Sequence, residues 1–96
     1  MISLKFSAEV IYWRGPAPFY FAPVPEVQVK KIKEISSQLS YGWGVIPARV
    51  KIGKTEFSTS LFPRQGGYMV PIKNVVREAE GLDIEDKIVV QLFFGD

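Results

Sequence analysis

Neither cysteine nor histidine occurs among the 96 residues of this chain. Without cysteine there is no disulfide framework, no thiolate nucleophile and no zinc site of the cysteine type. Without histidine the usual proton shuttle near neutral pH and the commonest metal ligand are missing, so Ser-His-Asp and Cys-His arrangements are excluded within the chain. We therefore expect a protein that is not an enzyme, with no catalytic residue, metal site or cofactor of its own.

Long apolar runs are also absent. The longest covers residues 19–24, which is far short of the roughly 20 residues that a membrane-spanning helix requires. The first five residues alternate between apolar and polar types instead of placing a basic stretch before an apolar block, unlike a signal peptide. We expect a soluble protein of the cytoplasm that has no contact with membranes.

What the chain does contain is ample material for one core. Hydrophobic residues make up 47% of the sequence and aromatic residues 14%, at or above the values of ordinary globular domains. A chain of this length forms one domain around one core, so residues 1–96 are expected to be a single domain. The formal net charge of +2 is too small to identify a nucleic-acid-binding protein by itself.

Alternation with a period of two predicts most of the strands. The even positions of residues 2–13 are apolar and most odd positions polar, which is typical of a strand with one buried face. Gly15-Pro16 then allows a turn into a second strand at residues 19–22. The same reasoning predicts further strands at residues 45–52, 56–62, 68–70 and 88–92.

Two short helices are expected, each after a Val-Pro pair. Pro25 and Pro71 suit the first helical position, where the N–H group that proline lacks would be unpaired anyway. The apolar residues that follow recur at spacings of three and four, which predicts one buried stripe on each helix. The stripes consist of Val29, Ile32, Ile35 and Leu39, and of Ile72, Val75, Val76 and Ala79. Gly42 and Gly81 are the expected helix ends.

The two Val-Pro pairs mark a doubling of the whole pattern. Pro25 and Pro71 are 46 positions apart (71 minus 25), and each is preceded by a hairpin and followed by a helix, a turn and a strand. Neither unit alone could cover its apolar face, so the two halves are expected to close one barrel about a pseudo-twofold axis. The fold prediction is a mainly β protein, a double-split β-barrel of about seven strands with two short helices. Because both halves are present in one chain, we expect mainly a monomer. The alternative is an α+β chain that only looks repetitive.

A family resemblance agrees with this fold. It is carried by Trp13-x-Gly15-Pro16, Phe21, Val24-Pro25, Val45-x-Pro47, Phe57-Ser58-Thr59-Ser60-Leu61-x-Pro63, Gly67-Tyr68, Pro71, Val76-Arg77 and Gly81-Leu82. In this order they resemble the uncharacterised bacterial and archaeal family DUF1905 over nearly the whole chain, and the second half also resembles the AbrB and MazE type regulators. The resemblance implies a double-split β-barrel, no established activity and a distant relation to DNA-binding barrels. Related sequences commonly have Gly-Asp before the last strand, where this chain has Glu85-Asp86, so its bend must be made differently.

Seven residues are the candidates for a ligand-binding surface: Trp13, Arg49, Lys51, Ser60, Tyr68, Lys73 and Arg77. Arg49 and Lys51 share a face of a predicted hairpin, and Lys73 and Arg77, four residues apart, share a face of a predicted helix. Cations in such positions suit phosphate or carboxylate groups. Trp13 and Tyr68 fall near strand ends, where amphipathic rings can line a shallow pocket.

Each candidate also has a purely structural interpretation. The basic strand residues are then a solvated face, Arg77 pairs with Glu80 or Asp86 to secure its helix, and the aromatic rings belong to the core. Asp83, Glu85 and Asp86 have the oxygen atoms for a hard cation but lack the spacing of an EF-hand loop, which favours a solvated turn.

Three functions remain open. The first is a binding module for an unknown small ligand or protein, which needs none of the missing catalytic groups. The second is DNA binding, suggested by the basic hairpin and by the regulator resemblance. The third is a cryptic hydrolase in which Ser58 or Ser60 works with a lysine, although alternating serines on a strand are ordinarily its solvent face.

Overall fold

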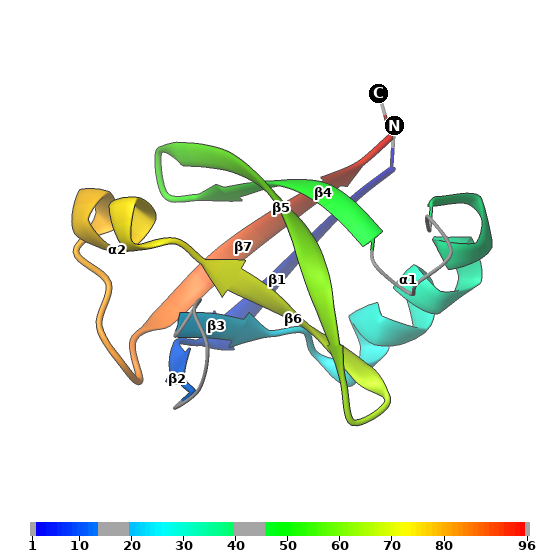
Figure 1. Cartoon of the computed structure of the whole chain (residues 1–96), viewed down its shortest axis with the longest axis horizontal. Coiled ribbons are helices and arrows are strands. Elements are labelled where there is room, and N and C mark those ends of the chain that lie inside the picture. Colours follow the sequence, from blue (N-terminus) through cyan, green and yellow to red (C-terminus); the bar gives the residue numbers. More distant parts are fainter. Residues whose placement is uncertain (1, 14–19, 40–45, 96) are drawn as a thin grey trace.

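A computed structural model describes residues 2–13, 20–39 and 46–95, which form seven strands and two helices. In chain order the elements are β1 (Ile2–Glu9), β2 (Ile11–Tyr12), β3 (Tyr20–Pro23), α1 (Glu26–Leu39), β4 (Ile46–Ile52), β5 (Thr55–Arg64), β6 (Gly67–Ile72), α2 (Asn74–Glu80) and β7 (Lys87–Phe94). Figure 1 shows the helices at opposite ends of a curled sheet, with the first and last strands ending side by side. The predicted Gly15-Pro16 turn and the end of the first helix at Gly42 lie outside the described residues.

Two stretches of the chain, the β1–β2 segment and β5, each pair with one neighbour in their first part and with another in their second part. This split pairing curls the sheet. The antiparallel order is β1-β7-β4-β5-β6-β3-β2, so β1 and β2 stand at its two ends although only Val10 separates them along the chain. β1 pairs with β7, whereas β2 pairs with β3. β5 behaves in the same way, because residues 55–61 pair with β4 and residues 62–64 pair with β6. The sheet is therefore barrel-like, with two split strands.

The pairing also relates the two halves of the chain. β1–β2, β3, α1 and β4 in the first half correspond to β5, β6, α2 and β7 in the second. Two ladders between the halves join corresponding strands, because β3 pairs with its counterpart β6 and β4 pairs with its counterpart β7. Within the β4–β7 ladder, Val50 lies opposite Leu92 and Ile52 lies opposite Val90. The predicted double-split barrel with two related halves is confirmed.

The offset along the chain between corresponding residues of the two helices is two residues larger than the predicted offset of 46. The carbonyl of Pro25 accepts the first helical hydrogen bond of α1, from the Val29 N–H at 2.9 Å, and the carbonyl of Lys73 does so in α2, from the Arg77 N–H at 3.0 Å. These capping residues are 48 positions apart (73 minus 25). Pro71 lies inside β6 opposite Phe21, so the prediction that it opens the second helix is wrong. Proline suits either place because its fixed φ fits both an extended strand and a first helical turn.

The buried stripe of the second helix is narrower than predicted. Val76 is buried, but Val75 is 68% exposed and Ala79 is exposed. Ile72 is buried as expected, yet it belongs to β6. Because α2 starts at Asn74 and is only seven residues long, it presents a single row of side chains to the sheet. The stripe of α1 is confirmed at Val29 and Ile32, which are both buried.

The difference in burial between Val75 and Val76 of α2 is directly testable. We expect Val75→Lys to change the free energy of unfolding by less than about 0.5 kcal/mol, because the side chain is already in solvent. Val76→Ala removes two methyl groups from the core and should cost about 2 kcal/mol. Urea unfolding followed by circular dichroism measures both values. Similar losses for the two variants would contradict the helix orientation.

The bend before β7 is made without glycine. Glu85 adopts a left-handed φ of 72°, and its N–H donates to the Val10 carbonyl at 2.8 Å. The Val10 N–H in turn donates to the Asp86 carbonyl at 2.9 Å, which interrupts the first strand between β1 and β2. Residues 2–13 are therefore two strands rather than one, and Tyr12, predicted to face inward, is 47% exposed. The Asp83 N–H donates to Asp86 Oδ2 at 2.8 Å and stabilises the turn.

A side chain with positive φ costs about 1–2 kcal/mol, and glycine removes that cost while losing about 0.5–1 kcal/mol of chain entropy. We therefore expect Glu85→Gly to raise the free energy of unfolding by about 0.5 kcal/mol. Glu85→Ala keeps the Cβ atom and should give no such gain. Thermal and urea unfolding of the three proteins provide the comparison, and a destabilised Glu85→Gly protein would show that the Glu85 side chain itself supports the bend.

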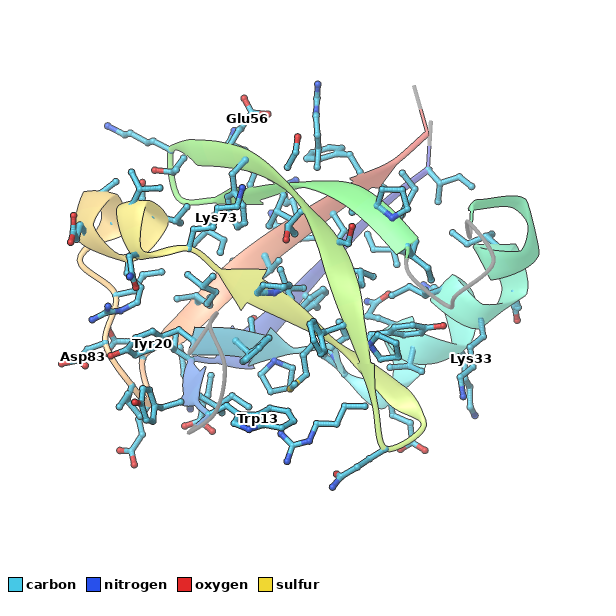
Figure 2. All side chains as sticks on the ribbon, viewed as in Figure 1. Trp13, Tyr20, Lys33, Glu56, Lys73 and Asp83 are labelled. Atoms are coloured by element: carbon cyan, nitrogen blue, oxygen red, sulfur yellow. The ribbon has the colours of Figure 1, made fainter. Side chains whose placement is uncertain are left out.

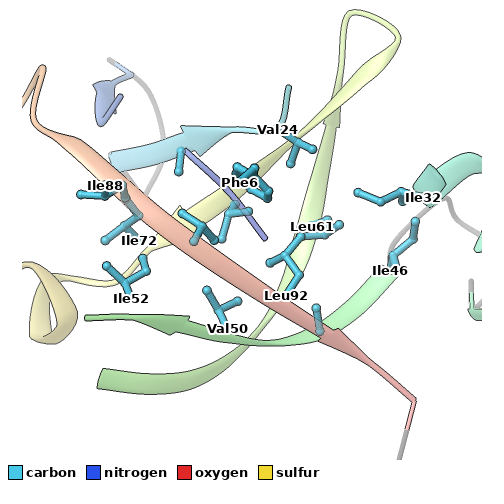
Figure 3. Close-up of a cluster of buried hydrophobic side chains, with 14 of the residues drawn as sticks. Phe6, Val24, Ile32, Ile46, Val50, Ile52, Leu61, Ile72, Ile88 and Leu92 are labelled. Carbon is cyan, nitrogen blue, oxygen red and sulfur yellow. The ribbon is translucent and has the colours of Figure 1, made fainter. Parts of the chain in front are cut away.

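Side chains from both halves fill one core. Figure 3 shows Phe6, Leu61, Ile72 and Leu92 meeting between the strands, with Ile32 reaching them from α1. No polar or charged residue in the described part of the chain is buried. Gly81 has the left-handed φ of 63° expected after a helix, which confirms its predicted role at the end of α2.

Candidate functional site

A second apolar cluster lies on the outer face of the sheet. Along β3 and β6, alternate residues such as Ala22 and Val70 enter the core, whereas Phe21 and Met69 are buried without belonging to the core cluster. The ring centroids of Phe21 and Phe62 are 5.8 Å apart, and Phe62 lies opposite Met69 in the ladder. Phe62 of β5 and Trp13 therefore cover part of the outer side of β3 and β6.

Trp13 and Arg64 complete this surface. The Arg64 guanidinium carbon lies 3.9 Å from the centroid of the Trp13 ring, and its Nη1 lies 3.9 Å from the Met69 sulfur. The Trp13 centroid is 5.9 Å from that of Phe21. Phe62 remains 47% exposed. We call Trp13, Phe21, Phe62, Arg64 and Met69 the outer cluster; Figure 2 shows Trp13 at the lower edge of the view, away from both helices.

A second arginine is stacked on an aromatic ring on the other face of the β2–β3 ribbon. The Arg77 guanidinium carbon is 3.7 Å from the Tyr20 centroid. Tyr12 lies opposite Tyr20 in the ladder, and their rings meet edge to face at 5.2 Å. Lys73 is exposed immediately before α2. Figure 2 shows Lys73 and Tyr20 well apart in this view. We call Tyr12, Tyr20 and Arg77 the Arg77 site.

Arg77 does not secure α2 through the carboxylates suggested by the structural interpretation. Glu80 Oε2 accepts hydrogen bonds from the Thr55 hydroxyl at 2.5 Å and from the Lys54 N–H at 3.3 Å. Asp86 Oδ2 accepts from the Asp83 N–H. Both carboxylates therefore stabilise turns by accepting hydrogen bonds from residues in or beside them. Arg77 Nε is buried without a hydrogen-bond partner in the described part of the structure.

The predicted basic hairpin is partly neutralised. Lys51 is half-buried and lies opposite Glu56 on one side and Gln91 on the other. Arg49 is exposed, and its guanidinium carbon is 5.9 Å from the centroid of the neighbouring Phe93 ring. Two cations on one strand with a carboxylate directly beside them form a weaker positive field than the sequence suggested.

Ser60 and Tyr68 lie apart from these groups. Ser60 is opposite Pro47, four residues along β4 from Lys51, a separation of about 14 Å at roughly 3.4 Å per residue. Tyr68 is half-buried and packs against the core, on the opposite face from the outer cluster. The hydrolase hypothesis therefore has no close pair formed by Ser60 and Lys51.

Of the seven candidates, the structure places Arg49 and Lys51 on the same face of β4 and stacks Arg77 on Tyr20. Lys73 precedes α2 in an extended conformation, and Trp13, Ser60 and Tyr68 lie in separate environments. Sequence reasoning missed Phe62 and Arg64. One signal was present, because Leu61 and Phe62 are consecutive apolar residues in an otherwise alternating strand, which indicates apolar surroundings on both faces of β5.

The described residues contain no group of three or more acidic side chains arranged to hold a metal ion. None of the helices described is both long enough and apolar enough to traverse a bilayer.

Two related halves, two split strands and a helix in each half define a small double-split β-barrel domain. The chain belongs to the family described as Domain of unknown function (DUF1905), which matches residues 6–92. No curated protein matches the chain.

Proposed function

We propose that this domain is a non-enzymatic binding module, and that the outer cluster binds a segment of a partner protein. The observation that carries the proposal is the combination of a half-exposed Phe62 with an Arg64–Trp13 stack above the buried side chains of Phe21 and Met69. Tryptophan and arginine dominate the binding energy of many protein interfaces, and phenylalanine and methionine are enriched there.

The geometry of the cluster suits a partner with both apolar and acidic side chains. Stacking on Trp13 restricts the Arg64 side chain, so less conformational entropy is lost when a carboxylate binds its N–H groups. Phe62 supplies apolar area that is already partly desolvated by its neighbours. An apolar anchor and one carboxylate on the partner would use both features.

Support for a non-enzymatic role comes from the chain's chemistry. Histidine and cysteine are absent, and Ser60 lies four residues along the ladder from Lys51. DNA binding is the weaker alternative, because the described arginines lie on three different surfaces and Lys51 lies beside Glu56. Binding that depends on phosphate contacts would weaken steeply with salt.

Peptide selection tests the proposal. A displayed library of random peptides is panned against the immobilised protein, and enriched peptides are synthesised and titrated by anisotropy. We expect Phe62→Ala and Arg64→Ala to weaken binding at least tenfold, as for interface residues worth more than about 1.4 kcal/mol. Val89→Ala is the matched control, because Val89 is 48% exposed on β7, outside the cluster.

Two outcomes would overturn the proposal. One is a set of enriched peptides whose affinity is the same for the Phe62→Ala, Arg64→Ala and Val89→Ala proteins. The other is a failure to enrich any peptide while a short DNA duplex binds with a dissociation constant below about 100 μM at low salt and is released as salt rises. The second result would favour the regulator-like function.

A further inference from the structure

We propose a second binding site, independent of the outer cluster, in which Arg77 binds the oxyanion of a small carboxylate- or phosphate-bearing ligand. The site lies between α2 and the β2–β3 ribbon and consists of Tyr12, Tyr20 and Arg77. Three observations support it: the comparison of the two halves, the lack of a hydrogen-bond partner for Arg77 Nε among the described residues, and the geometry of the stacked guanidinium.

The first observation comes from the relation between the halves. With the helix caps aligned at Pro25 and Lys73, the counterpart of Arg77 is Val29 (77 minus 48). Val29 is buried, and its Cγ2 lies 3.6 Å from the position that a Cβ atom on Gly67 would take. The first half therefore fills this place in the fold with an apolar side chain and has proline where the second half has Lys73. The fold itself requires neither cation.

The second observation is that Arg77 Nε is buried and has no hydrogen-bond partner among the described residues. The guanidinium group has five N–H donors, and a half-buried one is ordinarily hydrogen-bonded. The nearby carboxylates of Glu80 and Asp86 accept hydrogen bonds from other groups. Because Arg77 as a whole is only half-buried, an external anion can bind the solvent-exposed part of its guanidinium and balance its charge.

The third observation concerns geometry. The 3.7 Å contact with Tyr20 holds the guanidinium over the ring, and cation–π contact of this kind uses its face rather than its N–H edge. The planar fork of arginine matches the paired oxygens of carboxylate or phosphate groups. Lys73, which precedes α2 in an extended conformation, is exposed and adds positive charge near the start of the helix. The site therefore favours an oxyanion over a neutral ligand.

Nuclear magnetic resonance of the arginine side chains tests the site on the unmodified protein. The Nε–H signals of Arg77 and Arg49 are followed while sodium phosphate or sodium acetate is added at constant ionic strength. We expect a saturable shift of the Arg77 signal with a dissociation constant no weaker than about 10 mM for one of the anions. Arg49 is exposed on β4 beside Phe93, outside both proposed sites, and serves as the internal reference. The anion with the higher affinity identifies the ligand as a phosphate or a carboxylate.

Variants separate binding from folding. Arg77→Val copies the first half of the chain, so we expect it to fold with an unchanged unfolding midpoint and to lose the saturable chemical-shift changes of the backbone amides around Tyr20. Arg77→Lys keeps the charge but not the fork, and should weaken binding at least tenfold. Arg49→Ala, a change outside both proposed sites, should bind the anion normally.

The proposal is overturned if the Arg77 and Arg49 signals shift equally and without saturation, if neither shifts, or if Arg77→Val binds as the unmodified protein does. An Arg77→Val protein that unfolds would also overturn it, because Arg77 would then be needed for the fold. None of these outcomes bears on peptide binding by the outer cluster, which Arg64→Ala and Phe62→Ala examine separately.

Discussion

Leu92→Ala is expected to lower the free energy of unfolding by about 2–5 kcal/mol, the range for deleting most of a buried leucine side chain. Leu92 is fully buried in β7, where it lies between Leu4 of β1 and Val50 of β4. The three strands come from both halves, so the cavity weakens the contact between the halves as well as the packing within one of them. Urea unfolding followed by circular dichroism measures the loss.

Val89→Ala is the control on the same strand, because Val89 is 48% exposed and should change stability by less than about 0.5 kcal/mol. Equal effects of the two substitutions would mean that β7 does not present alternate faces to core and solvent. Since small domains are stable by only about 5–15 kcal/mol, the Leu92→Ala protein should also show a clearly lower midpoint of thermal unfolding.

Ile32→Asp is expected to have a larger effect, a loss of more than about 4 kcal/mol or failure to fold. Ile32 is fully buried where α1 packs against the barrel. The substitution removes its apolar contacts and places a carboxylate in a region where no described polar or charged residue is buried, and an unpaired buried charge is among the most costly changes in a protein. Circular dichroism and the urea midpoint report the result.

Val27→Asp provides the comparison within the same helix. Val27 is 66% exposed, close to the first turn of α1, where a negative charge is favourable. We expect its unfolding midpoint to stay at the value of the unmodified protein. If the unfolding midpoint of Ile32→Asp were the same as that of Val27→Asp, Ile32 would not anchor α1 to the core. The helix could then not be assigned to the packed structure of either half.

The strands were predictable because their chemistry is local. Alternation of apolar and polar residues depends only on the period of two along an extended chain, and Phe6, Leu61 and Leu92 are buried as that pattern predicts. The helix of residues 26–39 was predictable for the same reason, from the spacing of Val29 and Ile32.

The alignment of the two halves was not predictable to the residue. Pro25 caps a helix and Pro71 sits in a strand, although both follow valine and both satisfy the same local preference for φ. Which of the two places a proline takes depends on its partner across the sheet, and Phe21 is 50 positions away from Pro71 (71 minus 21). The exposure of Val75 follows from that shift in the start of the helix.

The candidate sites divide in a similar way. The spacing of Lys73 and Arg77 predicts that they share a helix face, but Lys73 precedes α2 in an extended conformation, so only Arg77 lies on the helix. The stack of Arg77 on Tyr20 and that of Arg64 on Trp13 join residues 57 and 51 positions apart (77 minus 20, 64 minus 13), so no local pattern contains them. They arise only when the split strands bring the two halves together.

The amino-acid sequence alone determined that this is a mainly β domain with two related halves and with no cysteine or histidine chemistry. Those properties depend on composition and on short periods along the chain. Only the tertiary structure decided which side chains cover the outer face of β3 and β6, which carboxylates are already engaged, and that Arg77 Nε has no hydrogen-bond partner among the described residues. Such contacts depend on the register between strands distant in sequence, and a shift of one residue would turn every side chain to the other face.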